Sequence, residues 1–302
     1  MPSLISLSDV TDNDLHRMVS RALEFAGGSR SSALTGRVVG TYFRRTSTRT
    51  RTAFSAGALR LGADVLAYGP DDLQLATGET PRDTGRVLSG MIDLLVARTA
   101  DSMDELRAFA DQGRMPVVNA MSAVEHPTQA IADLATLQEQ FGRVDDLHVL
   151  YLGEGNNTAT ALAIALARYP GTRLELRTPA GYGLPVDYLE RAQALAARSG
   201  AEIVERHDLA DVGSDVDVIY TTRWQTTGTS KPDPNWRADF APFQVTEALW
   251  EHFPKAIFMH DLPAHRGEEV TADVLDGPVS LAFRQAEHKM FSAMAVLEWC
   301  AA

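Results

Sequence analysis

Short runs rich in β-forming residues alternate with helical patterns along almost the whole chain, and this alternation restricts its fold more than any other feature. The runs are Val38–Phe43, Val65–Tyr68, Leu94–Ala97, Val117–Asn119, Leu147–Leu152, Leu174–Leu176, Glu202–Val204, Val216–Thr221 and Ala256–Met259. The first four are expected to be buried strands. Strands separated by helical segments are typical of parallel sheets, so the pattern predicts two doubly wound α/β domains.

Polar residues at Gly142–Asp146 interrupt this alternation, and we place the domain boundary there. We expect a first domain at 1–141, a second at 142–282, and a terminal segment at 283–302. The helix within that segment, about Gln285–Trp299, could pack on either domain from its pattern alone. Ligands of parallel α/β sheets bind at the carboxyl ends of the strands, so motifs at those ends are functional candidates.

Composition narrows the partners of this 302-residue chain. A formal net charge of −12 disfavours nucleic acid and anionic membranes. Cys300 is the single cysteine and cannot form an internal disulfide, which fits a reducing compartment. No stretch approaches the roughly 20 apolar residues of a membrane span, and Met1–Leu23 lacks a signal-peptide core. We predict a cytoplasmic protein without nucleic-acid or membrane partners.

Ser47–Arg51 combines three hydroxyls and two arginines at the point where a predicted strand gives way to a helical pattern. A helix N-terminus offers unpaired N–H groups and a partial positive charge. Added hydroxyls and guanidinium donors favour a phosphate dianion. The alternative is that Ser47 or Thr48 only caps the helix while the arginines are solvated.

Three further clusters follow strands. Arg98 closes Leu94–Ala97 and is either a ligand contact or a surface ion-pair partner. His126 precedes Pro127 at a helix start, where the helix dipole lowers the pKa of an imidazole so that a neutral ring could donate to a substrate oxygen. A helix-capping role is the alternative. His260–Pro263 ends the last strand, and Pro263 alone would explain the turn there.

These clusters, taken in order, resemble the aspartate/ornithine carbamoyltransferase family, and Asn156–Asn157 and the long run His260–Val270 favour its ornithine branch. The matching segments span nearly the whole chain and are Phe43–Arg51, Asp83–Thr84, Arg86–Leu88, Arg98, His126–Gln129, Ala132–Asp133, Gly155–Asn157, Asp217–Thr221, His260–Val270 and Gln285–Glu287. The resemblance implies an enzyme whose first domain binds carbamoyl phosphate and whose second binds an amine. It also implies that the C-terminal helix returns to the first domain.

The resemblance implies transfer of the carbamoyl group of carbamoyl phosphate to an amine, giving a ureido product and phosphate. Residues expected to bind carbamoyl phosphate are Ser47, Thr48, Arg49, Thr50, Gln74, Arg98, His126, Gln129, Leu262 and Lys289. Arg98, His126 and Thr50 would act in catalysis by stabilising the developing oxyanion. No metal or organic cofactor is required. The family's site is shared within a trimer, so we expect a homotrimer in which a neighbour supplies the loop Asp71–Arg82, with Gln74 as the contact.

The expected acceptor residues depart from the family pattern. They are Asn157, Thr222, Thr226, Thr227, Asp261 and Leu262. Thr222 replaces the branch's aspartate, Thr226–Thr227 replace its Ser-Met pair, and Asp261 replaces the cysteine of His-Cys-Leu-Pro. Because a buried unpaired carboxylate is costly, Asp261 is expected to meet a cation, from the substrate or from Arg223 or Arg266. Lys289 stands where the branch has an arginine.

A carboxylate is thus absent at residue 222 and present at residue 261, and this relocated charge predicts an acceptor other than ornithine, such as 2,3-diaminopropionate. In the alternative, Asp261 and Thr222 compensate each other and ornithine itself is carbamoylated to citrulline. Two other classes stay open. One is a non-catalytic regulatory homologue. The other is a dinucleotide-binding enzyme, because Gly153–Thr158 with Glu175 about 20 positions on approximates that fingerprint.

Overall fold

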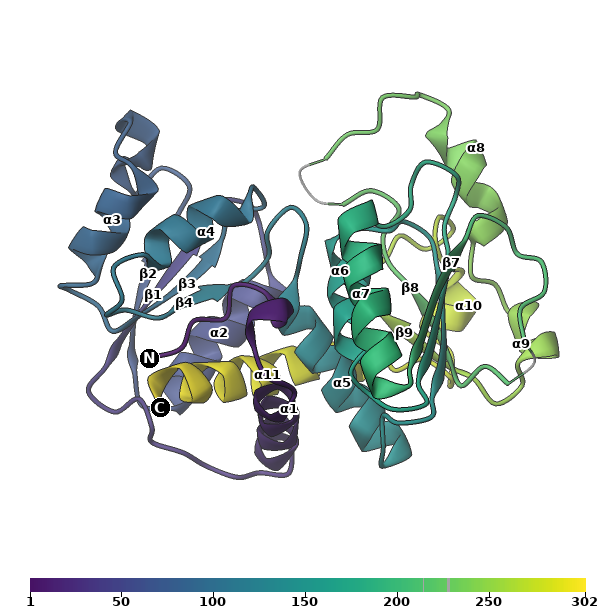
Figure 1. The fold of residues 1–302 in the computed structure, drawn as a ribbon, viewed down its shortest axis with the longest axis horizontal. Coiled ribbons are helices and arrows are strands. Elements are labelled where there is room, and N and C mark those ends of the chain that lie inside the picture. The colour runs from purple at the N-terminus through teal and green to yellow at the C-terminus, as the bar shows by residue number, and fades with distance from the viewer. Residues whose placement is uncertain (214, 227–228) are drawn as a thin grey trace. The chain divides into compact units, whose positions relative to one another are not determined.

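The computed structural model describes residues 1–213, 215–226 and 229–302, which form two compact units (Figure 1). The first unit comprises Met1–Ala135 and Glu287–Ala302, and the second comprises Thr136–Ala286. Two helices, α5 (Pro127–Phe141) and α11 (Ala282–Ala301), each continue from one unit into the other. The predicted fold of two parallel-sheet α/β domains, with a C-terminal helix that returns to the first, is confirmed.

The first unit is built on a four-stranded parallel sheet in the order β2-β1-β3-β4. Its strands are β1 (Val38–Phe43), β2 (Asp64–Tyr68), β3 (Leu94–Arg98) and β4 (Val117–Asn119). Its remaining elements are η1 (Leu7–Asp9), α1 (Asp12–Ala26), α2 (Arg49–Arg60), η2 (Gln74–Thr77), α3 (Pro81–Leu88) and α4 (Met103–Ala110).

The two edges of this sheet differ. β4 is buried because the N-terminal segment pairs with it: the Leu4 N–H donates to the Val117 carbonyl and the Asn119 N–H donates to the Leu4 carbonyl, at 3.0 and 2.8 Å. β2 lies at the other edge and is largely exposed. The prediction that Val65–Tyr68 is a buried strand was therefore wrong, because an apolar run does not reveal whether its strand is central or at an edge.

The second unit has a five-stranded parallel sheet in the order β7-β6-β5-β8-β9. The strands are β5 (His148–Leu152), β6 (Arg173–Arg177), β7 (Glu202–Arg206), β8 (Val218–Thr221) and β9 (Ile257–His260). The other elements are α6 (Asn157–Leu166), α7 (Val186–Ser199), α8 (Trp236–Phe240), η3 (Ala241–Phe243), α9 (Leu249–His252) and α10 (Ala272–Leu275). In Figure 1, α6 and α7 lie side by side against this sheet.

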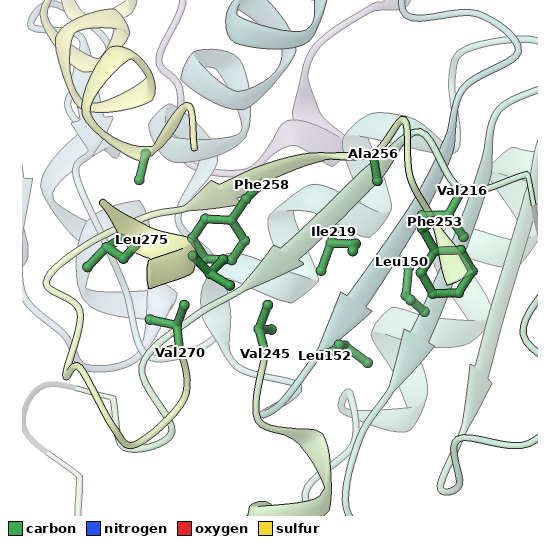
Figure 2. Close-up of a cluster of buried hydrophobic side chains, with 12 residues drawn as sticks. Leu150, Leu152, Val216, Ile219, Val245, Phe253, Ala256, Phe258, Val270 and Leu275 are labelled. Carbon is green, nitrogen blue, oxygen red and sulfur yellow. The ribbon is translucent and has the colours of Figure 1, made fainter. Parts of the chain in front are cut away.

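One face of the second sheet forms an apolar core with α10 and its neighbouring segments (Figure 2). Leu150, Ile219 and Phe258 extend from three adjacent strands toward Val245 and Leu275 on the covering segments. This burial fixes the positions of the strands whose carboxyl ends carry the candidate acceptor residues. No helix among the described residues is long and apolar enough to cross a membrane.

Phe258→Ala should lower the free energy of unfolding by about 3–5 kcal/mol, because it opens a cavity where the wild-type side chain is 0% exposed. The matched control is Phe283→Ala, at a side chain 55% exposed, for which we expect a change within about 0.5 kcal/mol. Urea titration followed by circular dichroism measures both. Equal losses would contradict the assignment of this core.

Candidate active site

In the first unit, the candidate residues gather at the carboxyl edge of the sheet. β1 and β3 are paired in register, with Phe43 opposite Arg98, so the loop after β1 begins beside Arg98. That loop contains Ser47 and Thr48 and leads into α2, whose first residue is Arg49. Thr48 occupies the N-cap position but its side chain makes no capping hydrogen bond. The interpretation that this hydroxyl only caps the helix is therefore not supported.

The charges at the start of α2 are opposite to those that a helix prefers. Its first turn has no acidic residue and begins with Arg49, followed by Arg51. A cation at a helix N-terminus opposes the macrodipole, an interaction of about 0.3–1 kcal/mol per charge. A bound dianion would reverse that penalty, because it would interact favourably with the helix N–H groups and the guanidinium groups together. This local arrangement is suited to a phosphate.

Arg98, Thr50 and His126 form the polar centre of this edge. All three side chains are buried, and Arg98 Nη1 donates to Thr50 Oγ1 at 3.3 Å. Burial lowers the pKa of His126 well below its ordinary value, and the positive charges of Lys289 and Arg98 lower it further. The expected direction is correct, but burial rather than the helix dipole is the main cause. A neutral imidazole beside two cations can donate a hydrogen bond to an anionic substrate oxygen.

The turn that carries His126 is fixed by the N-terminal segment. Glu125 is fully buried, and its carboxylate accepts from the Ser6 hydroxyl at 2.6 Å and from the Leu7 N–H at 2.7 Å. The Ser122 hydroxyl donates to the Glu125 carbonyl at 3.0 Å. His126 is thus held by contacts from residues more than 100 positions away in the sequence, which is the kind of support that preorganised catalytic donors need.

Gln129 connects this centre with the C-terminal helix. Its Nε2 donates to Asp133 at 2.8 Å, and its Oε1 accepts from the Lys289 ammonium. Both Gln129 and Lys289 are buried. The structure therefore brings together Thr50, Arg98, His126, Gln129 and Lys289 in the first unit, although they come from four separate segments of the chain.

Gln74 lies elsewhere in the first unit. It is exposed at the start of η2, where its side-chain oxygen accepts from Thr77 at 2.7 Å. Among the described residues, no hydrogen bond joins it to Arg98 or His126. A role for Gln74 in a neighbouring subunit stays a prediction.

In the second unit, Asp261 is the centre of the candidate acceptor residues. Register places Leu152 beside Thr221 and Thr221 beside His260, so the segments after β5, β8 and β9 start together. The Asp261 carboxylate accepts from Thr222 Oγ1 at 2.9 Å and from Thr158 Oγ1 at 2.8 Å. Asn156 Nδ2 donates to Thr226 Oγ1 at 3.2 Å, and buried Asn157 begins α6. Thr227 lies outside the described residues.

One of the cation partners expected for Asp261 from the sequence is paired elsewhere. Arg266 instead forms a two-point ion pair with Asp276, at 2.6 and 2.8 Å. Asp261 has two hydroxyl donors, and His260 Nδ1 lies 3.5 Å from its Oδ1. Hydroxyl donors stabilise a carboxylate without neutralising it, so Asp261 can still attract a cation from a substrate.

Leu262 has a left-handed backbone, with φ of 53°, which is unusual for a residue with a Cβ. Its N–H donates to His260 Nδ1 at 2.8 Å, while His260 Nε2 faces the buried Glu269 carboxylate at 3.2 Å. These bonds stabilise a backbone that would otherwise be strained, and strained backbone is often found at functional sites.

The dinucleotide alternative does not fit this unit. Glu175, the acidic residue of the approximate fingerprint, is 1% exposed and forms an ion pair with buried Arg177. It also lies 3.3 Å from His148 Nε2. A Cβ at Gly155 would lie 2.3 Å from the Gly183 carbonyl carbon, so this glycine permits close packing of two loops. The same residues therefore have structural roles.

One group of side chains has the composition of a metal site. Ligand atoms of His265, Glu268 and Glu269 lie within 4.8 Å of one another. However, Glu269 already accepts from the His265 N–H and faces His260. We assign no metal to this group, because its one buried carboxylate fixes the backbone around Leu262.

Comparison with known proteins assigns both units to one family. The model "Aspartate/ornithine carbamoyltransferase, carbamoyl-P binding domain" matches residues 3–139, and the model for the Asp/Orn binding domain matches residues 145–300. The chain belongs to the aspartate/ornithine carbamoyltransferase family. Its reaction class is therefore carbamoyl transfer, and the prediction of a transferase is confirmed.

Individual relatives agree with this family. The ornithine carbamoyltransferase of Bacillus subtilis is 36% identical over 296 residues, covering 98% of this chain and 92% of the relative. That of Thermococcus kodakarensis is 41% identical over 271 residues, covering 89% and 85%. The solved ornithine carbamoyltransferase from Pyrococcus furiosus has a TM-score of 0.92 at 37% identity, covering 98% of this chain and 96% of its own.

Sequence reasoning missed several residues of the carbamoyltransferase. Thr158, a donor to Asp261, directly follows the Asn pair but was not singled out. Glu154 and Lys231 form a partly buried ion pair close to the acceptor residues. A signal for Lys231 existed, because the sequence contains only three lysines among its 28 basic residues.

The depressed pKa of His126 predicts a pH-dependent stability. Below the ordinary histidine pKa of about 6.5, the unfolded chain binds a proton at this residue that the folded protein does not bind. Between pH 7.5 and 5.5 this should lower the free energy of unfolding by up to about 1.4 kcal/mol. Urea titrations at both pH values measure this loss. In His126→Gln, the loss between the two pH values should be smaller than in the wild type by up to about 1.4 kcal/mol.

The control for this comparison is His252→Gln, at an exposed residue, which should keep the wild-type difference between the two pH values. A wild-type difference fully retained in His126→Gln would show that the buried imidazole is not its source.

Proposed function

We propose that this carbamoyltransferase transfers the carbamoyl group of carbamoyl phosphate to the amine of an ornithine-like amino acid other than ornithine, with 2,3-diaminopropionate as the candidate. The observation that carries this proposal is the carboxylate of Asp261, which accepts from the Thr222 and Thr158 hydroxyls. The ornithine branch has a carboxylate at the position of Thr222. Relocation of this charge changes the distance from the anchored ammonium to the attacking amine, so acceptor length is the property that should change.

Carbamoyl phosphate would occupy the first unit. Its phosphate would be bound by Ser47, Thr48 and Arg49 at the start of α2. Arg98, Thr50 and neutral His126 would donate to the carbamoyl oxygen as it gains negative charge, which can contribute several kcal/mol of barrier lowering. Gln129 would accept from the carbamoyl amino group while Lys289 holds its side chain.

The acceptor would bind to the second unit through Asp261, with Asn157 and Leu262 as further contacts. The reacting amine must be neutral. Its lone pair attacks the carbonyl carbon, a C–N bond forms, and the bond from that carbon to the phosphate oxygen breaks. The departing phosphate accepts the amine proton, so the chemistry balances without a metal or an organic cofactor.

Ornithine is the second candidate acceptor, favoured by a specific contact. Thr222 Oγ1 lies 2.9 Å from Asp261 Oδ1, so the relocated carboxylate is only one hydrogen bond from the position where the ornithine branch has its own. The relatives from Bacillus subtilis and Thermococcus kodakarensis, 36% and 41% identical, are also named ornithine carbamoyltransferases. We propose a homotrimer for either acceptor, with Gln74 reaching a neighbouring site.

Phosphate release from carbamoyl phosphate, measured with ornithine, 2,3-diaminopropionate, putrescine, lysine and aspartate, tests the proposal directly. We expect the highest kcat/KM with a diamino acid shorter than ornithine, and mass spectrometry should detect its ureido product. Preference for ornithine would support the second candidate. Absence of phosphate release with every amine would favour a non-catalytic homologue.

The double variant Asp261→Cys/Thr222→Asp should shift preference toward ornithine by at least tenfold in the ratio of kcat/KM values, because it restores the charge arrangement of the ornithine branch. Its control is Asp276→Asn, which removes a carboxylate of the same unit that pairs with Arg266 instead. Unchanged selectivity in the double variant would contradict the role given to the relocated carboxylate.

A further inference from the structure

The side chain of Lys231 is buried against three aromatic rings in the second unit, and the proposed chemistry does not use it. Its side chain is 4% exposed, and its ammonium forms an ion pair with Glu154. Nζ lies 4.6 Å from the ring centre of Tyr182, 4.8 Å from that of Phe240 and 5.3 Å from that of Trp236. We call this arrangement the lysine cage, formed by Glu154, Tyr182, Trp236 and Phe240.

The lysine cage compensates a charge that is costly to bury. Removing an ammonium group from water costs several kcal/mol unless it is paired. The Glu154 carboxylate supplies the pairing, and the negative faces of the aromatic rings add attraction for a cation. A chain that has only three lysines among 28 basic residues nonetheless has one here.

The rings of the lysine cage are themselves fixed. Phe240 is fully buried, and Trp236 packs edge-on against it at an interplanar angle of 90°. Tyr182 also packs against Phe240, with ring centres 4.8 Å apart. The Tyr182 backbone carbonyl accepts from the Gly155 N–H at 2.8 Å, which ties the Tyr182 backbone to the residue after Glu154. The lysine therefore occupies a site that its neighbours hold in place.

Hydrogen bonds connect the lysine cage with the acceptor residues. Glu154 Oε1 pairs with Lys231, and its Oε2 accepts from Thr226 Oγ1 at 3.1 Å. Thr226 Oγ1 in turn accepts from Asn156 Nδ2 at 3.2 Å.

The connection continues from Asn156 to Asp261. Asn156 Nδ2 also lies 3.5 Å from Thr222 Oγ1, the hydroxyl that donates to Asp261. The Asn156 side-chain oxygen caps α6 by accepting from the Thr158 N–H at 3.0 Å, and Thr158 is the second donor to Asp261. The orientation of Glu154 thus affects both hydroxyl donors of the acceptor carboxylate.

We propose that Lys231 is a positioning residue for the acceptor site, which fixes Glu154 and through it Thr226, Asn156 and the donors to Asp261. This inference rests on the proposed function, because it assigns the amine to that site. Lys231 touches neither Asp261 nor the carbamoyl phosphate residues in any described contact. Its removal should therefore affect binding of the amine and not of carbamoyl phosphate.

Steady-state kinetics of Lys231→Met, which keeps the side-chain length and removes the charge, tests this proposal with the amine that the wild type uses best. We expect KM for the amine to rise at least tenfold, with KM for carbamoyl phosphate within twofold of wild type. The matched control is Lys255→Met, at an exposed lysine of the same unit, which should retain wild-type constants.

Glu154→Gln provides an independent variant should Lys231→Met not fold. It should raise KM for the amine to a similar extent. The Lys231→Met/Glu154→Gln double variant should have a KM for the amine no higher than that of either single variant, because each of the three variants removes the same ion pair. An unchanged KM for the amine in both single variants would overturn the proposal. The proposal would also be overturned if the rise in KM for the amine in the double variant equalled the product of the rises in the two single variants.

Reductive methylation of the folded protein, followed by peptide mass spectrometry, tests whether the Lys231 ammonium occupies the lysine cage, and it does not depend on enzyme turnover. Lys255 should be methylated at least tenfold faster than Lys231 in the wild type, and Glu154→Gln should reduce that difference. Equal rates in the wild type would overturn the proposal.

The two methods separate the failure of this proposal from that of the proposed function. If no amine supports phosphate release in the wild type, the proposed function fails and this role for Lys231 fails with it, whatever the methylation rates. If the wild type is active and Lys231 is protected but its KM effect is absent, only the positioning role fails.

Discussion

Parallel pairing of the strands is the constraint on which the rest of the structure depends. In a parallel sheet every strand ends at the same edge, so loops that are distant in sequence start beside one another. The pairing of Phe43 with Arg98 does this in the first unit. Adjacent pairing of Leu152, Thr221 and His260 does it in the second. Most of the candidate residues end or follow the strands of these two registers, whereas Gln74, His126, Gln129 and Lys289 lie on other segments.

The two edges have opposite electrostatic character, and each suits one substrate. The first unit gathers Arg98 and Lys289 around an imidazole that burial keeps neutral, in a chain whose formal net charge is −12. This local excess of positive charge favours a substrate with a phosphate group. The second unit presents the Asp261 carboxylate with two hydroxyl donors, which favours an ammonium group. Carbamoyl transfer requires one substrate of each kind.

The residues proposed to bind the acceptor satisfy one another's hydrogen bonds. A carboxylate at residue 261 and a hydroxyl at residue 222 are in direct contact, so each satisfies the other in a partly buried setting where an unpartnered group would be costly. The support extends outward through Asn156 and Thr226 to Glu154 and Lys231. Acceptor choice would therefore depend on a connected set of residues more than on Asp261 alone.

The sequence by itself determined the strands, the helix at Arg49, the helix after His126 and the family, because periodicity and ordered motifs are local in the chain. Only the tertiary structure decided the partners of Asp261. Its donor Thr158 is 103 positions away, and Arg266, an expected partner, pairs with Asp276. It also decided that β2 is an exposed edge and that Lys231 lies in an aromatic cage. The physical reason is that strand order and the contacts of distant loops depend on packing, which local patterns do not encode.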